Sequence, residues 1–323
     1  MRRFLSPFRR LLLLALLAAS STVVAQTAPL RIIVGFPAGA TFDMVARLIG
    51  EQLREELGRP VIVENRPGAG GALANQHVKA APADDSTLLL APLTTLMMYP
   101  HSHPQLQYDP FKDFVPVVHV AKFPYALGVG TQVPANSFKQ YQELIKKNPK
   151  FGLFGSAGVG SATHYYGLMA AKASNLEFTH VPYKGTAGVL VAVRGGELPA
   201  GFVPLADMAG LASTGHAKLL AIVAEQRNQR FPDVPTFKEL GFNDIVTGGD
   251  YTIFAPAGTS QEFVTKISAA VRKILKRPAL VERFQQAYLE PTGYDASVVA
   301  RELRSGYDAW GVIIKSSGFR VDQ

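Results

Sequence analysis

The feature that constrains this chain most is a buried strand that turns into a helix between residues 31 and 43. Ile32 to Val34 form an unbroken apolar run, which is typical of a central parallel strand covered on both faces. Pro37 and Gly39 end the strand, and apolar residues then recur every three or four positions as far as residue 57. The pattern predicts one strand, turn and helix unit of an α/β fold.

The turn of this unit has two interpretations. Unpaired backbone N–H groups, together with the positive end of the helix dipole, face whatever lies above the end of the strand, and this is the outline of an anion site. The alternative is an ordinary turn, in which Thr41 caps the helix and Asp43 complements its dipole. The sequence of this unit alone leaves both open.

Residues 1–25 have the composition of a secretory signal peptide. A basic segment with four arginines precedes the apolar stretch from Leu11 to Ala19, which is too short to span a bilayer, and Val23-Val24-Ala25 is a small-residue cleavage site. We therefore predict cleavage after Ala25 and an exported, soluble, periplasmic protein. No cysteine is present, which excludes disulfides, thiolate metal sites and a lipid anchor on an N-terminal cysteine.

Charge and length bound the function of the remaining 298 residues. Without the four N-terminal arginines the formal charge falls from +8 to +4, and lysines and arginines are scattered among acidic residues. This distribution argues against nucleic-acid binding and favours a small anionic ligand. The length favours two modest cores, and hence two lobes.

Strands and helices alternate along most of the chain, as in doubly wound parallel sheets. Residues 113–121 and 125–129 are predicted to pair near a change of lobe, residues 252–255 to return to the first lobe, and everything after residue 259 to be helical. The other predicted strands are 61–63, 86–91, 151–154, 176–181, 198–203 and 219–223, and the other predicted helices are 72–81, 137–147, 162–169, 235–240, 261–276, 279–288 and 297–316.

A second glycine-rich turn precedes a helix at Gly155 to Ser161, with Ser161 as a natural N-cap. Lys184 and Thr186 follow another predicted strand and add a cation and a hydroxyl group. The glycines at 68–71 lack the GxGxxG spacing, so helix packing or a ligand-facing turn is favoured over a dinucleotide cofactor. We expect no cofactor and no metal.

Seven motifs, in order along the chain, resemble those of Bug-type extracytoplasmic solute receptors, the binding components of tripartite tricarboxylate transporters. The first is the turn at 37–43 with the following Ala46-Arg47, and Ala40 stands where the family usually has a second glycine. The others are Asn-Arg-Pro-Gly-Ala-Gly-Gly at 65–71, Asp-Phe-Val-Pro-Val at 113–117, Gly-Ser-x-Gly-x-Gly-Ser-x-x-His at 155–164, Val-Pro-Tyr-Lys-Gly at 181–185, Pro-Asp-Val-Pro-Thr-Phe at 232–237 and Ala-Pro-Ala-Gly-Thr at 255–259.

The resemblance implies a type II periplasmic-binding-protein fold, in which two α/β lobes joined by hinge strands close on a ligand. The expected lobes are residues 26–126 with 251–323, and residues 127–250. The implied function is capture of a carboxylate (a di- or tricarboxylate, an aromatic acid or an amino acid) and its delivery to integral membrane transporter subunits by a monomer without enzymatic activity. The first turn and the Gly-Ser turn are expected to hold one carboxylate from opposite lobes.

Some predicted site residues have a structural alternative. Ser156 and Ser161 either donate to the ligand or only shape their turn, whereas Asp43 either holds a ligand ammonium or supports its own turn. His164 is better explained as a packed or capping histidine, and Lys184 either pairs with a second carboxylate or is solvated. The full predicted ligand site is Phe36, Ala38, Gly39, Ala40, Thr41, Asp43, Ser156, Gly158, Ser161, His164, Lys184, Gly185 and Thr186.

The rival interpretation is an exported hydrolase that uses Ser156. Gly155-Ser156-Ala157-Gly158 resembles part of a nucleophile elbow. Phe154, however, stands where the GxSxG motif needs glycine, and no Ser, acid and His order follows. The sequence therefore favours a binding protein.

Overall fold

The computed structural model describes residues 28–245 and 248–317, which form two α/β lobes with one sheet each. Lobe 1 contains a six-stranded sheet in the order β11-β4-β10-β3-β1-β2, in which β2, β1 and β3 are parallel and β10 runs antiparallel to β3 and β4. Its strands are β1 (Leu30–Val34), β2 (Val61–Asn65), β3 (Thr87–Ala91), β4 (Phe114–Phe123), β10 (Gly249–Pro256) and β11 (Glu290–Asp295).

Lobe 2 contains a five-stranded sheet in the order β7-β6-β8-β5-β9. Here β6 is parallel to β7 and β8, whereas β5 is antiparallel to β8 and β9. The strands are β5 (Tyr125–Gly130), β6 (Leu153–Ser156), β7 (Thr179–Pro182), β8 (Ala200–Pro204) and β9 (Ala217–Val223).

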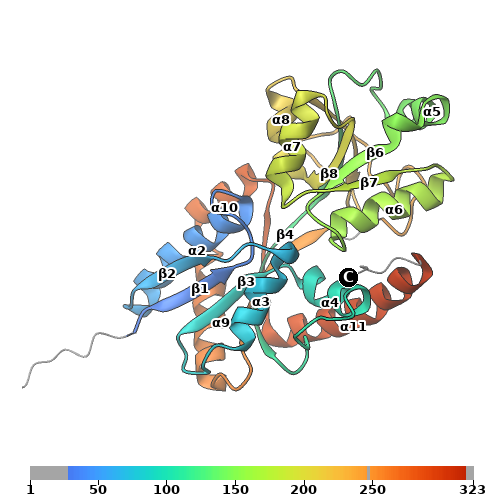
Figure 1. The fold of residues 1–323 in the computed structure, drawn as a ribbon. Helices are drawn as coiled ribbons and strands as arrows, with labels where there is room; N and C mark the ends of the chain where they lie inside the picture. The colour runs from blue at the N-terminus through green and yellow to red at the C-terminus, as the bar shows by residue number, and fades with distance from the viewer. Residues whose placement is uncertain (1–27, 246–247, 318–323) are drawn as a thin grey trace, which may run out of the picture.

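Helices cover both sheets, and Figure 1 shows α11, at the end of the chain, running beside α4, whereas α9 packs against α2 from the beginning of the chain. Lobe 1 carries α2 (Thr41–Leu57), α3 (Ala72–Lys79), α4 (Leu93–Ser102), α9 (Gln261–Ile274), α10 (Pro278–Gln286) and α11 (Ala296–Ser317). Lobe 2 carries α5 (Phe138–Lys147), α6 (Ala162–Ser174), α7 (Thr186–Gly195) and α8 (Leu205–Ser213).

The leading strand and helix unit folds as its sequence predicts. Ile32, Ile33 and Val34 in β1 are almost completely buried, and α2 places one apolar face on the core. The helix ends at Gly58, whose left-handed backbone (φ 61°) lets its N–H group bond back to the carbonyl of Arg54.

The chain crosses between the lobes twice. β4 lies in the first sheet and β5 in the second, with Pro124 alone between them, and the chain returns between β9 and β10. The predicted pairing of 113–121 with 125–129 is therefore wrong, because β4 pairs with β10 and β11 while β5 pairs with β8 and β9. Because these consecutive strands lie in different sheets, the segment connects the two lobes, and it is called the hinge below.

Two further predictions of secondary structure are wrong. Residues 290–295 form strand β11, although everything after residue 259 was expected to be helical. Residues 235–240 form turns instead of a helix: Thr236 and Glu239 exchange the side-chain bonds of a capping box, but Gly241 follows at once with φ 89°.

The predicted signal peptide, residues 1–25, lies outside the described residues. Across 28–245 and 248–317, no helix is both long enough and apolar enough to cross a membrane.

Candidate functional site

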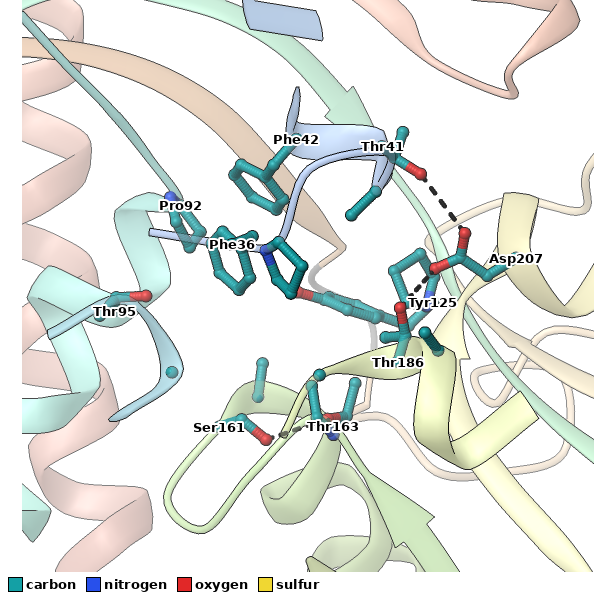
Figure 2. A pocket seen from close by; sticks show the side chains of 18 of the residues that line it. Phe36, Thr41, Phe42, Pro92, Thr95, Tyr125, Ser161, Thr163, Thr186 and Asp207 are labelled. Carbon is teal, nitrogen blue, oxygen red and sulfur yellow. Dashed lines mark hydrogen bonds between the residues drawn. The ribbon is translucent and has the colours of Figure 1, made fainter. Parts of the chain in front are cut away.

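A cavity of about 390 Å³ lies where the two lobes meet the hinge. Figure 2 shows Phe36, Thr41 and Phe42 of lobe 1 on one side of it and Thr163, Thr186 and Asp207 of lobe 2 on the other. The volume is in the range of small-molecule sites. The cavity is lined by residues 36–42, Gly70, Pro92, Thr94, Thr95, Met98, Tyr99, Phe123, Tyr125, Ala157, residues 161–163, residues 184–187, Leu190, Pro204, Asp207 and Tyr251.

Helix N-termini converge on this cavity from both lobes. The first turns of α2, α4, α6, α7 and α8 all contribute to its wall. The residues before α2, α7 and α8 are Ala40, Gly185 and Pro204, none of which caps its helix with a side chain. The first N–H group of α8, that of Leu205, already donates to the Pro124 carbonyl, so the first-turn N–H groups left for a bound molecule are those of α2 and α7, where the helix dipoles favour negative charge.

The turn between β1 and α2 is held rigid from outside the cavity. Asp43 accepts a hydrogen bond from the Gly39 N–H at 3.0 Å, and both of its oxygens lie 2.9 Å from the Arg47 guanidinium. Asn65, at the end of β2, donates to the Phe36 carbonyl at 3.1 Å. Burial raises the pKa of Asp43, but the bonds from Arg47, Gly39 and Asn65 outweigh it and hold the pKa below its ordinary value.

Aromatic rings form the wall on the hinge side. Phe123 ends β4, Tyr125 begins β5 and Tyr251 lies in β10. The centroid of the Phe123 ring lies 5.0 Å from that of Tyr125 and 4.8 Å from that of Tyr251. Phe42 continues the wall 4.4 Å from Tyr251 and stacks on Phe36 at 4.2 Å. The site therefore combines apolar walls with backbone N–H donors, and hydrogen bonds are strengthened in such a weakly polar environment.

Asp207 brings a carboxylate to the same cavity. Its Oδ1 accepts from the Thr41 hydroxyl at 3.3 Å and its Oδ2 from the Thr186 hydroxyl at 2.9 Å (Figure 2). Because Thr41 belongs to lobe 1 and Asp207 to lobe 2, the first of these bonds crosses between the lobes. Burial raises the pKa of Asp207, and the two threonine hydroxyl groups lower it only in part.

The structure gathers most of the sequence-predicted site residues at the cavity. Nine of the thirteen line it, namely Phe36, Ala38, Gly39, Ala40, Thr41, Ser161, Lys184, Gly185 and Thr186. Asp43, Ser156, Gly158 and His164 lie outside the lining. Asp43 supports its own turn, which was the structural alternative, and Ser161 caps α6 by accepting from the His164 N–H.

Ser156, Gly158 and His164 belong to a cluster behind the Gly-Ser turn, in which Ser156 and His164 are buried and Gly158 is partly exposed. The Ser156 hydroxyl lies 2.6 Å from His180 Nε2 and donates to the Gly158 carbonyl at 3.0 Å. His180 stacks on His164 at 3.8 Å, and Nδ1 of His164 accepts from the Gly160 N–H at 3.2 Å. This cluster fixes the shape of the turn.

The cluster also bears on the hydrolase interpretation, because it pairs a serine with a histidine. Ser156 is completely buried and lies outside the cavity lining, so no substrate reaches its hydroxyl in this structure. Burial lowers the pKa of His180 to about 4, which makes it a poor general base at neutral pH. The structure gives the hydrolase interpretation no support.

Ser156→Ala is therefore expected to act on stability and not on binding. It leaves His180 without its hydroxyl partner, and we expect the free energy of unfolding to fall by about 1–3 kcal/mol. Ligand affinity should change less than threefold. Urea unfolding and calorimetry measure the two quantities separately, and a tenfold loss of affinity at unchanged stability would return Ser156 to the binding site.

Several lining residues were missed from the sequence. Thr94 and Thr95 lie in the first turn of α4, which follows the buried strand β3 closely, so the strand-to-helix pattern that indicated the first turn was sufficient to indicate them. Thr163 follows Ser161 in the predicted Gly-Ser turn. Asp207 carries no such signal, because an acidic residue in the first turn of a helix is common.

The sequence matches the tripartite tricarboxylate transporter family receptor over residues 45–319. The chain belongs to this receptor family. A UPF0065 protein of Bordetella pertussis is 31% identical over 319 residues, which cover 98% of each chain. The resemblance read from the seven motifs is thereby confirmed.

Solved structures of similar proteins confirm the fold class. Rpa4515 of R. palustris, solved with adipate, superposes with a TM-score of 0.86 at 27% identity and covers 91% of this receptor and 98% of its own chain. MatC from Rhodopseudomonas palustris, solved with bound malate, superposes with a TM-score of 0.83 at 28% identity, and the match covers 89% of this receptor and 99% of MatC. The periplasmic binding protein BugD superposes with a TM-score of 0.84 at 28% identity, and the match covers 91% of this receptor and 98% of BugD. This receptor thus has the two-lobed α/β fold of periplasmic binding proteins.

Proposed function

We propose that this receptor is a periplasmic solute-binding protein that captures a small organic carboxylate (a di- or tricarboxylate, an aromatic acid or an amino acid) between its lobes. It then delivers the ligand, as a monomer, to the membrane subunits of a tripartite tricarboxylate-type transporter. The observation that carries the proposal is the convergence of uncapped helix N-termini from both lobes on one cavity.

The chemistry of the cavity suits a carboxylate. Its N–H donors are fixed by secondary structure, so they need little rearrangement when an anion binds. Lys184, which lies exposed at the cavity wall, adds a positive charge where the ligand enters. Adipate and malate in two relatives of the same family are both dicarboxylates.

Binding and release would follow from movement of the lobes. We propose that residues 26–126 with 251–323 and residues 127–250 move as two units about the crossings at Pro124 and before β10. The turn at 36–42 and the start of α7 would then form a complete site only when the lobes are closed. We also propose export through cleavage after Ala25 and an absence of catalysis.

A thermal-shift screen tests this function. If a carboxylate binds only the folded protein, ligand at about a hundred times its dissociation constant adds about 2.7 kcal/mol of stability. We therefore expect at least one acid among di- and tricarboxylates, aromatic acids and amino acids to raise the melting temperature by roughly 5 °C or more. The matched control for each hit is its neutral amide, which should give no shift. A screen in which no acid shifts the melting temperature contradicts the proposal.

A further inference from the structure

Asp207 is a negative charge inside a cavity that is otherwise built for an anion. It lies in the first turn of α8, and each of its oxygens accepts one bond from a threonine hydroxyl group. A carboxylate accepts about four hydrogen bonds, so about two remain. Because Asp207 lines the cavity, a bound molecule can reach this remaining capacity.

The charge of Asp207 has no positive partner among the described residues. Its hydrogen-bond donors are the neutral hydroxyl groups of Thr41 and Thr186. Asp43 shows the contrast, because Arg47 binds both of its oxygens and neutralises it outside the cavity. In the described cavity lining, Lys184 is the only lysine or arginine, and it forms no ion pair with Asp207.

A ligand with carboxylate groups alone meets this charge at close range. Like charges in a weakly polar cavity repel strongly, and burying an unpaired carboxylate is costly. A protonated amine on the ligand removes both costs, because it donates charge-assisted hydrogen bonds to Asp207. The rings of Phe36, Tyr125 and Tyr251 also suit a cation and the carbon skeleton that carries it.

We propose that Asp207 selects ligands in which a protonated amine accompanies the carboxylate, so that the substrate class of this receptor is amino acids and other amino-substituted acids. The inference rests on the proposed function and narrows it. The carboxylate binds the helix N-termini of α2 and α7, and the ammonium group binds Asp207 beside Thr41 and Thr186. The ammonium charge is then balanced by Asp207, and the carboxylate meets the positive ends of two helix dipoles.

The test compares acids that differ only by the amine. The pairs are phenylalanine with 3-phenylpropionate, glutamate with glutarate, and aspartate with succinate, each titrated by calorimetry into the wild type. In the pair that binds best, we expect the amino acid to bind at least tenfold more tightly than its deaminated partner. Asp207→Asn, which keeps the shape and can accept from one threonine hydroxyl while it donates to the other, should reduce this preference to less than threefold.

Thr41→Val is the matched control, because it removes the bond between the lobes but keeps the charge of Asp207. It should weaken both members of a pair equally and preserve the preference for the amino acid. The inference is overturned if the deaminated acids bind as tightly as the amino acids in the wild type. It is also overturned if Asp207→Asn and Thr41→Val each weaken the binding of both acids of a pair alike. Asp207 then contributes only its hydrogen bond between the lobes.

The same titrations separate this inference from the proposed function. If the deaminated acids bind tightly and Asp207→Asn does not change their affinity, the proposed carboxylate function stands and selection for an amine is refuted. If no acid of either kind binds, in these pairs and in the thermal-shift screen, the carboxylate function itself fails and the inference fails with it.

Discussion

Gly39→Asp is expected to weaken ligand binding at least tenfold while the protein stays folded. Gly39 lies in the turn that faces the cavity, and a Cβ atom at this position meets no other atom within 4 Å. The new carboxylate therefore fits, but it places a negative charge at the N-terminus of α2, where the ligand carboxylate is expected. The positive φ of 82° costs about 1 kcal/mol of stability, because aspartate adopts this region more easily than most residues.

Gly39→Asn separates charge from backbone strain. Asparagine has the same size and tolerates the same φ, but it is neutral. Calorimetry with the best ligand of the thermal-shift screen should show a small loss of affinity for Gly39→Asn and a large one for Gly39→Asp, with similar melting temperatures for the two free proteins. Equal affinities of the two variants for the ligand would place the carboxylate away from this turn.

The protein is also expected to lose at least about 3 kcal/mol of stability when the pH falls from 6.5 to 4. Burial lowers the pKa of His119 and of His164 to about 3 and that of His180 to about 4, and His180 also disfavours the charged form of His164. The unfolded chain takes up these protons near pH 6.5 and the folded protein does not. Stability is therefore present above pH 6.5 and is lost as the pH falls, by about 1.4 kcal/mol per pH unit for each histidine.

Two aspartates with raised pKa values, Asp250 and Asp207, act in the opposite direction. Burial raises the pKa of Asp250 to about 6, although bonds from Thr252 and the Leu93 N–H lower it in part, and burial also raises the pKa of Asp207. Acidification therefore stabilises the folded protein through these groups. Three histidines outweigh two aspartates, so the net change remains a loss of stability.

Urea unfolding at pH 7.5, 6.5, 5 and 4, followed by circular dichroism, measures this loss directly. Histidine resonances followed by NMR supply the control, because the rings of His119, His164 and His180 should still be neutral at pH 5. A free energy of unfolding that is constant from pH 6.5 to 4 would contradict the assignment of these histidines as neutral in the folded protein.

The sequence was sufficient for the parts of the fold that rest on local signals. The apolar run at Ile32 to Val34 and the glycine turns predicted the parts of the cavity wall that come from each lobe. Such predictions are possible because the end of a strand and the start of a helix depend on neighbouring residues. β11 was missed since Pro291 and Gly293 interrupt it, and such residues are tolerated in strands at the edge of a sheet. The capping box at Thr236 and Glu239 is a real helix signal, but it forms only a turn here.

The site was less accessible to sequence reasoning where it depends on distant residues. Thr41 and Asp207 are 166 positions apart, and no local pattern indicates that they share a hydrogen bond. Ser156 illustrates the same point, because its motif allowed either a ligand donor or a turn residue, and the structure places its buried hydroxyl group against His180. Which face of a turn meets the cavity is decided by packing between elements, and one sequence does not reveal it.

The position of β10 between β3 and β4 sets an order on the folding of a newly made chain. The strands of lobe 2, residues 125–223, pair only with one another in the described sheets, so this lobe can complete its sheet first. During that time β3 and β4 lack the strand that later separates them, and each presents an open edge. Lobe 1 closes only after residues 249–256 arrive, and such long-range pairing is slow. The half-made first sheet is therefore the part of the nascent chain that most needs protection from mispairing.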